Sequence, residues 1–446
     1  MRIGVFGTGY VGLVTACCFA DVGNTVICYD VDKEKVDILR KGKAPIYEKN
    51  LEEILKNNLS SGRIDFLNEP NAIIDQSEIL FIAVGTPEKP DGSADLTYVL
   101  QVAELIGKSI EDYKVVVNKS TVPVGTAELV NNQILKELEK REKKIEFDVI
   151  SNPEFLKEGN AVEDFKRPDR IIIGTDSKRA AELMAELYEP FSIRTDNKIM
   201  IMRQKSAELT KYAANSMLAT KISFINEISQ ISELAGADIE EIRLGLGSDS
   251  RIGYEFIYPG VGFGGSCFPK DLASLVSQAK NFDFEPHLLN ATLKRNEIQK
   301  LTLGKKIQKR FKKLSGKKFC IWGLSFKPET DDIREAPSID LVSFLLESGA
   351  EISAYDPMAM ENFKKLFPDN QKITFSCSSE EALYESDALI ILTEWKEFKN
   401  PDFYSIANKM KKPIIFDGRN TYSLQKVKKL EIPHLEYHSI GRDSVL

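Results

Sequence analysis

The sequence predicts an α/β protein with two Rossmann-like, doubly wound domains joined by a long central helical segment. Strand-like and helix-like segments alternate in the first 200 residues, the strand signal disappears between residues 201 and 312, and the first pattern returns in residues 313–446. Such alternation is typical of parallel sheets covered by helices. A chain of 446 residues is also too long for a single hydrophobic core. We therefore expect an N-terminal domain (1–200), a central helical domain (201–312) and a C-terminal domain (313–446).

The N-terminal domain begins with an apolar strand at residues 2–6. The run Gly7-Thr-Gly9-Tyr-Val-Gly12 follows and opens a helix to about residue 22, and a second strand at 25–29 ends at Asp30. Four later segments have the apolar character of buried strands: 79–84, 114–118, 147–151 and 171–174. Helix-length segments such as 95–109 and 126–142 separate them, which indicates a parallel, doubly wound sheet.

The first strand-to-helix turn carries a glycine fingerprint. Here Gly7 permits the tight turn, Gly9 admits a pyrophosphate and Gly12 allows close helix–strand packing, while the helix N-terminus faces the phosphates. Asp30 would accept hydrogen bonds from a ribose 2′-OH and repel a 2′-phosphate, so the pattern favours NAD over NADP. A glycine-rich turn without a ligand is the alternative. Lys35 lies either beside the adenine ribose or on a solvated helix face.

The central segment carries a helical pattern. Apolar residues recur here at helical spacing: Leu209, Tyr212, Met217, Ile222, Ile225, Ile228 and Ile231. Such a helical spine buries its apolar face either against a second subunit or within its own chain. Lys211 and Asn215 lie among these apolar residues. A Lys in that setting lies either at the helix surface or in a cleft, where it could act as an acid or base.

The C-terminal domain repeats three N-terminal segments in the same order. Residues 349–356 repeat the Gly-to-Asp spacing of 23–30, residues 386–393 resemble 77–84, and residues 319–323 take the place of 3–7. Separate βαβ units can converge on such patterns, but three ordered matches favour a second Rossmann-like domain entered through residues 313–318. Because Gly323-Leu-Ser-Phe-Lys lacks the full glycine fingerprint, we expect it to bind a different anionic ligand from the first domain, or none.

Polar residues follow several predicted strands, where open α/β sheets bind their ligands. Thr86 and Thr121 each follow a strand, and Glu154 and Glu158 follow another. Turn chemistry is the alternative for the two Thr, and a charged helix start for the two Glu.

Basic residues also flank turns of the C-terminal domain. Lys327 and Arg334 lie at its first turn, and Arg419 follows the expected strand at 413–416. Each of them, taken alone, is interpreted as a surface charge, but together they could clamp a diphosphate.

Cys267 lies in the run Tyr258-Pro-Gly-Val-Gly-Phe-Gly-Gly-Ser-Cys-Phe-Pro-Lys-Asp271. Glycines let backbone approach a ligand closely, and a reactive thiol needs an accessible, electropositive setting such as Lys270 provides. A buried structural thiol is the alternative. The setting favours a nucleophile for covalent chemistry on a carbonyl.

Composition and charge exclude several classes of partner. The net charge of −7 argues against nucleic acid or anionic membrane as the main partner, and no apolar run approaches the ~20 residues needed to span a bilayer. The six Cys lack metal-type spacing, so we expect no metal and a reducing cytoplasm. Only three His occur, so acid–base work would fall to Lys, carboxylates or water.

Over nearly its whole length the chain resembles the UDP-glucose/GDP-mannose dehydrogenase family. The matching motifs lie at residues 7–12, 120–123, 152–158, 211–215, 251–253, 262–271, 327–334 and 417–420. Residues 259–271 look most like the members that oxidise UDP-glucose, whereas GDP-mannose members tend to have Phe-Ala-Phe-Gly-Gly-Ser-Cys. The resemblance implies a four-electron oxidation of a sugar C6 alcohol to a carboxylate with two NAD in succession. GDP-mannose or another nucleotide sugar is the alternative substrate.

The resemblance also implies roles for individual residues. Lys211 and a water held by Asp271 would assist removal of the alcohol proton, Cys267 would bind the aldehyde covalently, and Glu154 with Thr121 would direct the hydrolytic water. Asn215 completes the expected catalytic set. The implied NAD contacts are Gly7, Gly9, Val11, Gly12, Asp30, Lys35, Thr86, Thr121, Glu158, Lys270 and Arg334. The implied contacts to UDP-glucose are Glu154, Phe155, Leu156, Lys157, Glu158, Lys211, Asn215, Tyr258, Gly260, Phe263, Gly264, Lys327 and Arg419. Arg251 would reach the substrate of the neighbouring subunit in a homodimer built on the helical spine.

Two other functions remain open. A two-electron hydroxyacid dehydrogenase would have no use for Cys267 or for a second Rossmann-like domain. A non-catalytic NAD sensor would bind NAD without turning over any sugar nucleotide.

Overall fold

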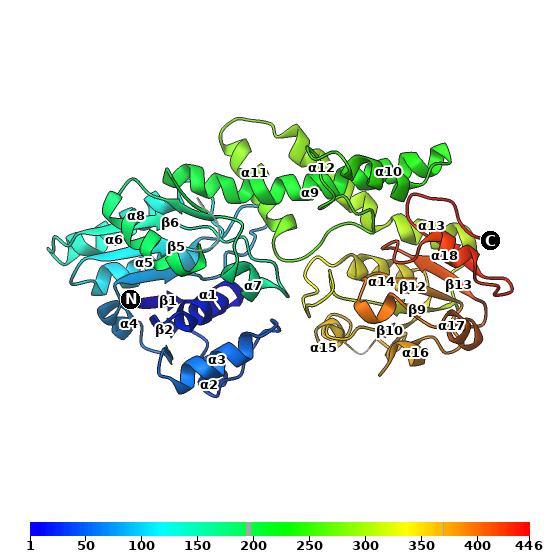
Figure 1. Ribbon diagram of the computed structural model, residues 1–446, viewed down its shortest axis with the longest axis horizontal. Coiled ribbons are helices and arrows are strands. Elements are labelled where there is room, and N and C mark those ends of the chain that lie inside the picture. The colour runs from blue at the N-terminus through cyan, green and yellow to red at the C-terminus, as the bar shows by residue number, and fades with distance from the viewer. Residues whose placement is uncertain (193–197, 369) are drawn as a thin grey trace. The chain divides into compact units, whose positions relative to one another are not determined.

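The computed structural model describes residues 1–192, 198–368 and 370–446. The chain forms two compact units: Met1–Ala214 with Ser277–Phe282, and Asn215–Val276 with Asp283–Leu446. Each unit contains one predominantly parallel sheet, and the long helix α9 (Gln204–Ala235) runs from the first unit into the second (Figure 1). The predicted fold class, two Rossmann-like domains joined by a long helical segment, is therefore confirmed.

The first sheet has eight strands in the order β3-β2-β1-β4-β5-β6-β7-β8. Their bounds are β1 Arg2–Phe6, β2 Thr25–Tyr29, β3 Ile64–Leu67, β4 Ile79–Ile82, β5 Lys114–Asn118, β6 Phe147–Ser151, β7 Ile171–Gly174 and β8 Ile199–Met202. Neighbouring strands are parallel except β6 and β7, which pair antiparallel at one position. The strand order reverses between β1 and β4, the kind of point at which open α/β sheets bind ligands.

The strands predicted from sequence occur close to their expected places. β4 ends at Ile82, two residues short of the expected 84, and β5, β6 and β7 have the expected bounds. The pattern missed β3 and β8, both only four residues long. The helices of this unit are α1 Tyr10–Asp21, α2 Lys33–Arg40, α3 Leu51–Ser60, α4 Pro70–Gln76, α5 Thr97–Ser109, α6 Thr126–Lys140, α7 Ala161–Lys166, α8 Lys178–Tyr188 and the 3₁₀ turn η1 Glu189–Phe191.

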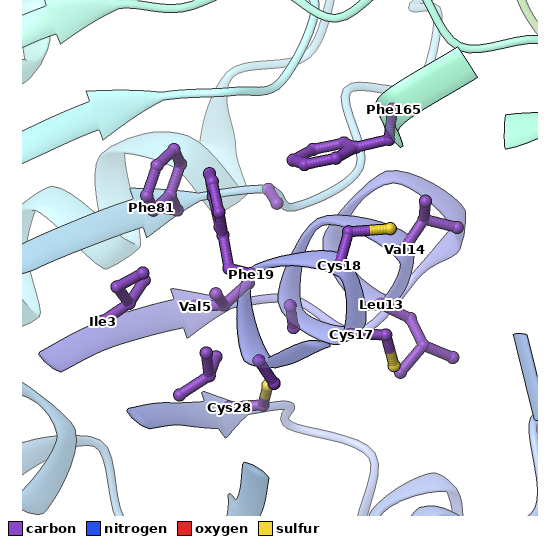
Figure 2. Packing of buried hydrophobic residues seen from close by; sticks show 14 of the residues in the cluster. Ile3, Val5, Leu13, Val14, Cys17, Cys18, Phe19, Cys28, Phe81 and Phe165 are labelled. Atoms are coloured by element: carbon purple, nitrogen blue, oxygen red, sulfur yellow. The ribbon is translucent and has the colours of Figure 1, made fainter. Parts of the chain in front are cut away.

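The core of the first unit packs α1 against the sheet. Phe19 of α1 lies between Phe81 of β4 and Phe165 of α7, with ring centroids 5.4 and 5.2 Å away (Figure 2). Cys17, Cys18 and Cys28 are fully buried in the same cluster. Burial raises the pKa of the Cys18 thiol to about 12. These thiols therefore pack as small apolar groups and are not nucleophiles.

The second sheet repeats the topology of the first six strands. Its order is β11-β10-β9-β12-β13-β14, and all its neighbouring strands are parallel. The strand bounds are β9 Lys318–Trp322, β10 Glu351–Tyr355, β11 Ile373–Phe375, β12 Ala388–Ile391, β13 Ile414–Asp417 and β14 Glu436–His438. β9, β10 and β12 occupy the places of β1, β2 and β4, so the three sequence repeats correspond to equivalent strands.

The helices of the C-terminal part cover this second sheet. They are α14 Pro337–Glu347, α15 Met360–Lys364, α16 Ser379–Ala382, α17 Phe403–Lys409, α18 Leu424–Lys428 and the 3₁₀ turn η2 Lys396–Phe398. Besides α9, the central segment contains α10 Ile239–Gly247, α11 Phe268–Asn281, α12 His287–Lys300 and α13 Thr302–Phe311. The loop that carries Cys267 lies between α10 and α11 (Figure 1).

Candidate active site

The glycine fingerprint has the geometry that a dinucleotide needs. Gly7 has φ +95°, and a Cβ on Gly12 would lie 1.9 Å from the Gly7 carbonyl oxygen, so both positions require glycine. A Cβ on Gly9 would meet no atom within 4 Å, which leaves open space beside the N-terminus of α1. This space and the helix N-terminus suit a pyrophosphate. Val11, on the first turn of α1, is half-buried.

Asp30 is a buried, ionised carboxylate at the end of β2. Its Oδ2 accepts hydrogen bonds from Thr8 N (2.8 Å), Thr8 Oγ1 (2.7 Å) and Lys35 Nζ (3.0 Å). Burial favours the neutral acid, but the hydrogen bonds from Thr8, Asp32 and Lys35 outweigh it and lower the pKa of Asp30. Oδ1 accepts from Asp32 N (3.1 Å) and has a second lone pair for a ribose hydroxyl. Lys35 thus pairs with Asp30 and is not a solvated helix charge.

The loops after β4 and β5 lie side by side at the same edge of the sheet. Thr86 Oγ1 donates a hydrogen bond to the Thr121 carbonyl oxygen (2.9 Å), and Ser120 Oγ donates to the Val84 carbonyl oxygen (2.7 Å). The structure therefore brings Thr86 and Thr121 together. The Thr86 hydroxyl ties the two loops to each other, which is the turn chemistry considered as its alternative role.

Glu154 and Lys211 form a buried ion pair. Lys211 Nζ lies 2.8 Å from Glu154 Oε1, and both side chains are 5% exposed. Burial alone would raise the pKa of Glu154. The charge and hydrogen bond of Lys211 lower this pKa, with smaller contributions from the Leu156 N–H group and Lys119, and together they outweigh the effect of burial. Lys211 Nζ also lies 5.3 Å from the centre of the Phe155 ring. Lys211 is therefore not a surface residue, and Glu154 is held as an ionised carboxylate.

Thr121 and Lys211 line one small cavity. It measures about 10 Å³, and its other lining residues include Ser120, Ser151 and Glu208. A cavity of this size holds about one water molecule. The hydroxyl, ammonium and carboxylate groups around it could position that water.

Lys119 is a buried charged residue near Glu154 that the sequence did not single out. It follows β5 directly, is 4% exposed, and its Nζ donates hydrogen bonds to Asn152 Oδ1 (3.0 Å) and Tyr188 OH (3.2 Å). Burial lowers the pKa of Lys119 to about 7, with Lys211 adding to the effect and Glu154 opposing it. The available signal was a Lys two residues after the run Val115-Val-Val117 and immediately before Ser120.

Cys267 caps the N-terminus of α11. Its carbonyl oxygen accepts the first helical hydrogen bond, from Asp271 N (2.8 Å), and the helix begins at Phe268. The thiol is half-buried, and Ser266 Oγ lies 3.5 Å from Sγ. The partial positive charge of a helix N-terminus stabilises a thiolate. Cys267 therefore differs from the fully buried thiols of the first unit and has the setting of a nucleophile.

Asn215, Lys270 and Asp271 meet in one buried cluster. Asn215 Nδ2 donates to Asp271 Oδ2 (2.6 Å), and Lys270 Nζ lies 2.7 Å from Asp271 Oδ1. Asp271 is 1% exposed, so these two donors compensate for the burial of its charge. The same contacts connect Cys267, at the start of α11, to α9. Lys211 and Asn215, four residues apart, are both on α9.

The glycines before Cys267 are required by packing inside the second unit. A Cβ on Gly264 would lie 2.2 Å from the Glu335 carbonyl oxygen, and one on Gly265 would lie 2.7 Å from the Phe326 ring. Gly265 N also donates to the Arg334 carbonyl oxygen (2.8 Å). The sequence predicts that these glycines make room for a ligand, but at these two positions they let the loop approach the turn after β9.

Arg419 links this loop to the second sheet. Its guanidinium donates to the carbonyl oxygens of Leu392 (2.7 Å), Phe326 (3.2 Å) and Gly262 (3.4 Å), and it lies 3.4 Å from a Glu394 carboxylate oxygen. Arg419 is therefore held in place at the carboxyl end of β13.

Lys327 and Arg334 lie at the neighbouring turn. Lys327 Nζ is 5.5 Å from the Phe326 ring centre, and Arg334 forms a two-point ion pair with Asp332. Of these three basic side chains, Arg419 contacts residues 260–265 directly, Lys327 lies over Phe326, and the Arg334 guanidinium is paired with Asp332.

The acidic residue of the second domain is saturated by its own chain. Asp356, the counterpart of Asp30, accepts hydrogen bonds from the N–H groups of Leu324, Ser325, Met358 and Ala359 and from Trp395 Nε1. A ribose hydroxyl would have to displace one of these donors. This supports the expectation that the second domain does not bind a dinucleotide in the manner of the first.

The remaining predicted residues have varied settings. Tyr258 and Arg251 are exposed, the latter with 87% of its side chain, and Arg251 pairs with Asp249 (2.6 Å). Phe263 is buried against Phe268, with ring centroids 5.9 Å apart. Leu156 and Glu158 are half-buried, and Lys157 lies 3.4 Å from Asp164.

None of the described helices is long and apolar enough to cross a membrane.

Comparison with known proteins covers nearly the whole chain. Residues 1–192, 205–298 and 320–424 match, respectively, the NAD binding, central and UDP binding domains of the UDP-glucose/GDP-mannose dehydrogenase family. UDP-glucose 6-dehydrogenase of Pseudomonas aeruginosa is 46% identical, covering 99% of this chain and 98% of that protein. UDP-glucose 6-dehydrogenase TuaD of Bacillus subtilis is 42% identical, covering 100% and 94%. The UDP-glucose dehydrogenase structure from Pyrobaculum islandicum matches with a TM-score of 0.90 and 37% identity, covering 99% and 98%.

Proposed function

Since the chain belongs to the UDP-glucose/GDP-mannose dehydrogenase family and carries its NAD binding domain, we propose that it oxidises UDP-glucose to UDP-glucuronate. The observation that carries this proposal is a half-buried thiol at a helix N-terminus, in a chain that also has a dinucleotide fingerprint. An alcohol-to-aldehyde dehydrogenase needs no nucleophile. Oxidation of the aldehyde to the acid needs a nucleophile, because the aldehyde must be held and given a tetrahedral carbon before a second hydride can leave.

The first oxidation requires removal of a proton from the C6 hydroxyl as hydride leaves C6. NAD, when bound, would supply the two-electron oxidant, with one molecule accepting the hydride in each of the two oxidations. The proton passes to a water held by Asp271, assisted by the Lys211 ammonium. Asn215 and Lys270 orient the Asp271 side chain by their hydrogen bonds of 2.6 and 2.7 Å. The product of this step is an aldehyde at C6.

The second oxidation takes place on Cys267. The thiolate adds to the aldehyde carbon, and the oxygen takes a proton to give a thiohemiacetal. Loss of a second hydride and of the hydroxyl proton converts it to a thioester. Glu154 then accepts a proton from a water that Thr121 helps to position, and the resulting hydroxide displaces the thiolate to release the carboxylate. The lowered pKa of Glu154 keeps it in the ionised form that a base requires, and at the same time makes it a weak base.

We propose that the residues implied by the family resemblance contact the nucleotide sugar. They are Glu154, Phe155, Leu156, Lys157, Glu158, Lys211, Asn215, Tyr258, Gly260, Phe263, Gly264, Lys327 and Arg419. The basic side chains among them would bind the diphosphate. The three-part division at 1–200, 201–312 and 313–446 remains our proposal for how these tasks are distributed.

Turnover with a panel of nucleotide sugars, with NADH counted per sugar, tests the function. We expect UDP-glucose to be the preferred substrate and two NADH to form per molecule, because the thioester route consumes two hydride acceptors. A preference for GDP-mannose would contradict the choice of substrate. One NADH per sugar would exclude the route through Cys267, and binding of NAD without turnover of any sugar would indicate a sensor.

We also propose that the enzyme is a homodimer built on α9. Met217, Phe224 and Ile231, spaced seven residues apart along one face, are 62%, 52% and 55% exposed. An exposed apolar stripe of this kind marks an interaction surface. Phe224→Glu is expected to shift the molecular mass in solution from dimer to monomer. Lys178→Gln on α8 changes the net charge by the same amount and should leave the mass unchanged, and a dimeric Phe224→Glu variant would contradict the proposal.

Arg251 is proposed to contact the substrate of the neighbouring subunit. Its side chain extends into solvent, as a residue serving a second subunit would. Mixing Cys267→Ser and Arg251→Ala proteins tests this, because in a mixed dimer one site keeps its own thiol and receives an intact Arg from the other subunit. Random mixing should restore about a quarter of wild-type activity. If Arg251 serves its own subunit, mixing restores nothing.

We place the enzyme in a reducing cytoplasm, in keeping with six cysteines that form no disulfide in the described part of the chain.

A further inference from the structure

The loop before Cys267 is buried without belonging to a helix or a sheet. Residues 259–265 are all buried and lie outside regular secondary structure. Buried backbone N–H and C=O groups need hydrogen-bond partners. Here the partners for two of the residues are buried amide side chains from the central helices.

Asn296 of α12 pairs with both backbone groups of Phe263. Its Oδ1 accepts from Phe263 N (2.8 Å), and its Nδ2 donates to the Phe263 carbonyl oxygen (2.9 Å). Gly260 is held in the same way by two residues: its N–H donates to Asn226 Oδ1 of α9 (2.8 Å), and its carbonyl oxygen accepts from Gln299 Nε2 of α12 (2.5 Å). The three amide residues are at most 6% exposed.

Packing leaves the loop backbone little conformational freedom between these contacts and the Cys267 thiol. Gly262 has φ +100°, and a Cβ there would lie 2.8 Å from Asn296 Oδ1, so the amide occupies the space beside the loop. Gly265, two residues after Phe263 and two before Cys267, is fixed by its hydrogen bond to the Arg334 carbonyl oxygen. The loop is therefore held at residues 260, 263 and 265 before it reaches the nucleophile.

We propose that Asn226, Asn296 and Gln299 form an amide clamp that holds this loop in its reactive geometry, with Asn296 as the main positioning residue for Cys267. This inference rests on the proposed function of Cys267. Asn296 acts through the Phe263 peptide groups rather than on the substrate. A displacement of about 1 Å in a reacting group can reduce turnover about a hundredfold, so the clamp should matter for kcat.

Asn296→Asp is the sharpest test because it preserves shape and removes one donor. In its ionised form the substituted carboxylate would still accept from Phe263 N but would repel the Phe263 carbonyl oxygen. In its protonated form the carboxyl can donate to that oxygen and restore both contacts. Turnover relative to wild type should therefore fall as pH rises and recover as pH falls. Burial keeps the titration of such a carboxyl in an accessible range by raising its pKa.

The charged neighbours on α12 are already paired. Lys300 forms ion pairs with Glu335 (3.1 Å) and Asp340 (3.2 Å), and Arg295 hydrogen-bonds to Gln230 (3.2 Å) and Gln299. These ion pairs and hydrogen bonds are present in both wild type and variant. The pH dependence of the ratio of variant to wild-type activity therefore reports on the substituted side chain. Lys294→Gln, on the exposed part of α12, changes net charge by the same amount and should show no pH-dependent ratio.

Asn296→Ala removes both contacts at every pH. We expect kcat to fall at least about tenfold, with the KM for NAD unchanged. Hydrogen exchange followed by mass spectrometry should show faster exchange in the peptide covering residues 258–267, while the strands of the second sheet keep wild-type protection. This measurement needs no turnover, so it tests the clamp even if the protein does not oxidise UDP-glucose, in which case the proposed function alone fails.

Two results would overturn the inference. One is an Asn296→Asp activity ratio that does not vary with pH. The other is wild-type exchange of the 258–267 peptide in Asn296→Ala. If the Ala variant does not fold, the Asn296→Asp variant compared at low and high pH still decides, because the same molecule regains or loses the donor.

Discussion

Replacing Cys267 with Ser should reduce formation of UDP-glucuronate by at least about a thousandfold and leave binding of UDP-glucose nearly unchanged. Ser preserves the size of the side chain at the start of α11, so the loop and helix should remain intact. A hydroxyl in this position stays protonated at neutral pH, whereas the helix N-terminus favours the thiolate. Without the covalent adduct, the aldehyde has no route to a thioester.

The measurement is NADH formed per sugar, together with UDP-glucose binding followed by calorimetry. Cys377→Ser is the matched control, because Cys377 is an exposed thiol two residues before α16 and its loss should not alter turnover. If Cys267→Ser still yields two NADH per sugar at a rate near that of wild type, the thiol has no part in the reaction.

The topology could be predicted from the sequence because buried parallel strands are continuous apolar runs. The Val-rich run of β5 and the Ile-rich run of β7 are such segments, and the sequence repeats predicted β9, β10 and β12. β3 was missed because Ile64-Asp-Phe-Leu alternates over only four residues. β8 was missed because two of its apolar residues, Met200 and Ile201, are exposed at the sheet edge, so burial does not govern its pattern.

The residues expected to carry the chemistry were easier to recognise from the sequence than the residues that contact them in the fold. Cys267 and its glycines are contiguous in sequence, but the Glu154–Lys211 pair joins residues 57 positions apart. Such a pairing depends on how β6 and α9 pack, which no local pattern reports. The same holds for the amide clamp: Asn226, Asn296 and Gln299 interrupt helical patterns, and only the fold shows that they face a buried loop. The function of a buried polar residue was visible only once its hydrogen-bond partners were known.

The second large effect is expected for Lys211→Met. The variant keeps the length of the side chain and removes the charge that faces Glu154 at 2.8 Å. Removal of one partner from a buried ion pair costs about 3–5 kcal/mol of unfolding free energy, because the other charge stays buried without compensation. Turnover should also be nearly lost, since no ammonium remains to assist removal of the alcohol proton.

The pH dependence of stability should change sign in this variant. In the wild type the pKa of Glu154 is lowered in the folded state, so Glu154 stabilises the fold above the unfolded pKa of about 4.5 and this contribution is lost as pH falls through the folded pKa. With Lys211 replaced, burial dominates and the folded pKa rises above the unfolded one. Glu154 then favours folding when protonated, and that contribution is lost as pH rises through the folded pKa.

The double variant Glu154→Gln/Lys211→Met separates stability from catalysis. With no carboxylate left to bury, it should regain much of the lost unfolding free energy and show neither pH trend, yet it should remain inactive. Urea unfolding of wild type, both single variants and the double variant between pH 4 and pH 9 measures all of this. If Lys211→Met instead loses stability by the same amount at every pH, Glu154 does not depend on Lys211 for its charge, and the buried pair is not the acid–base unit proposed for the first and last proton transfers.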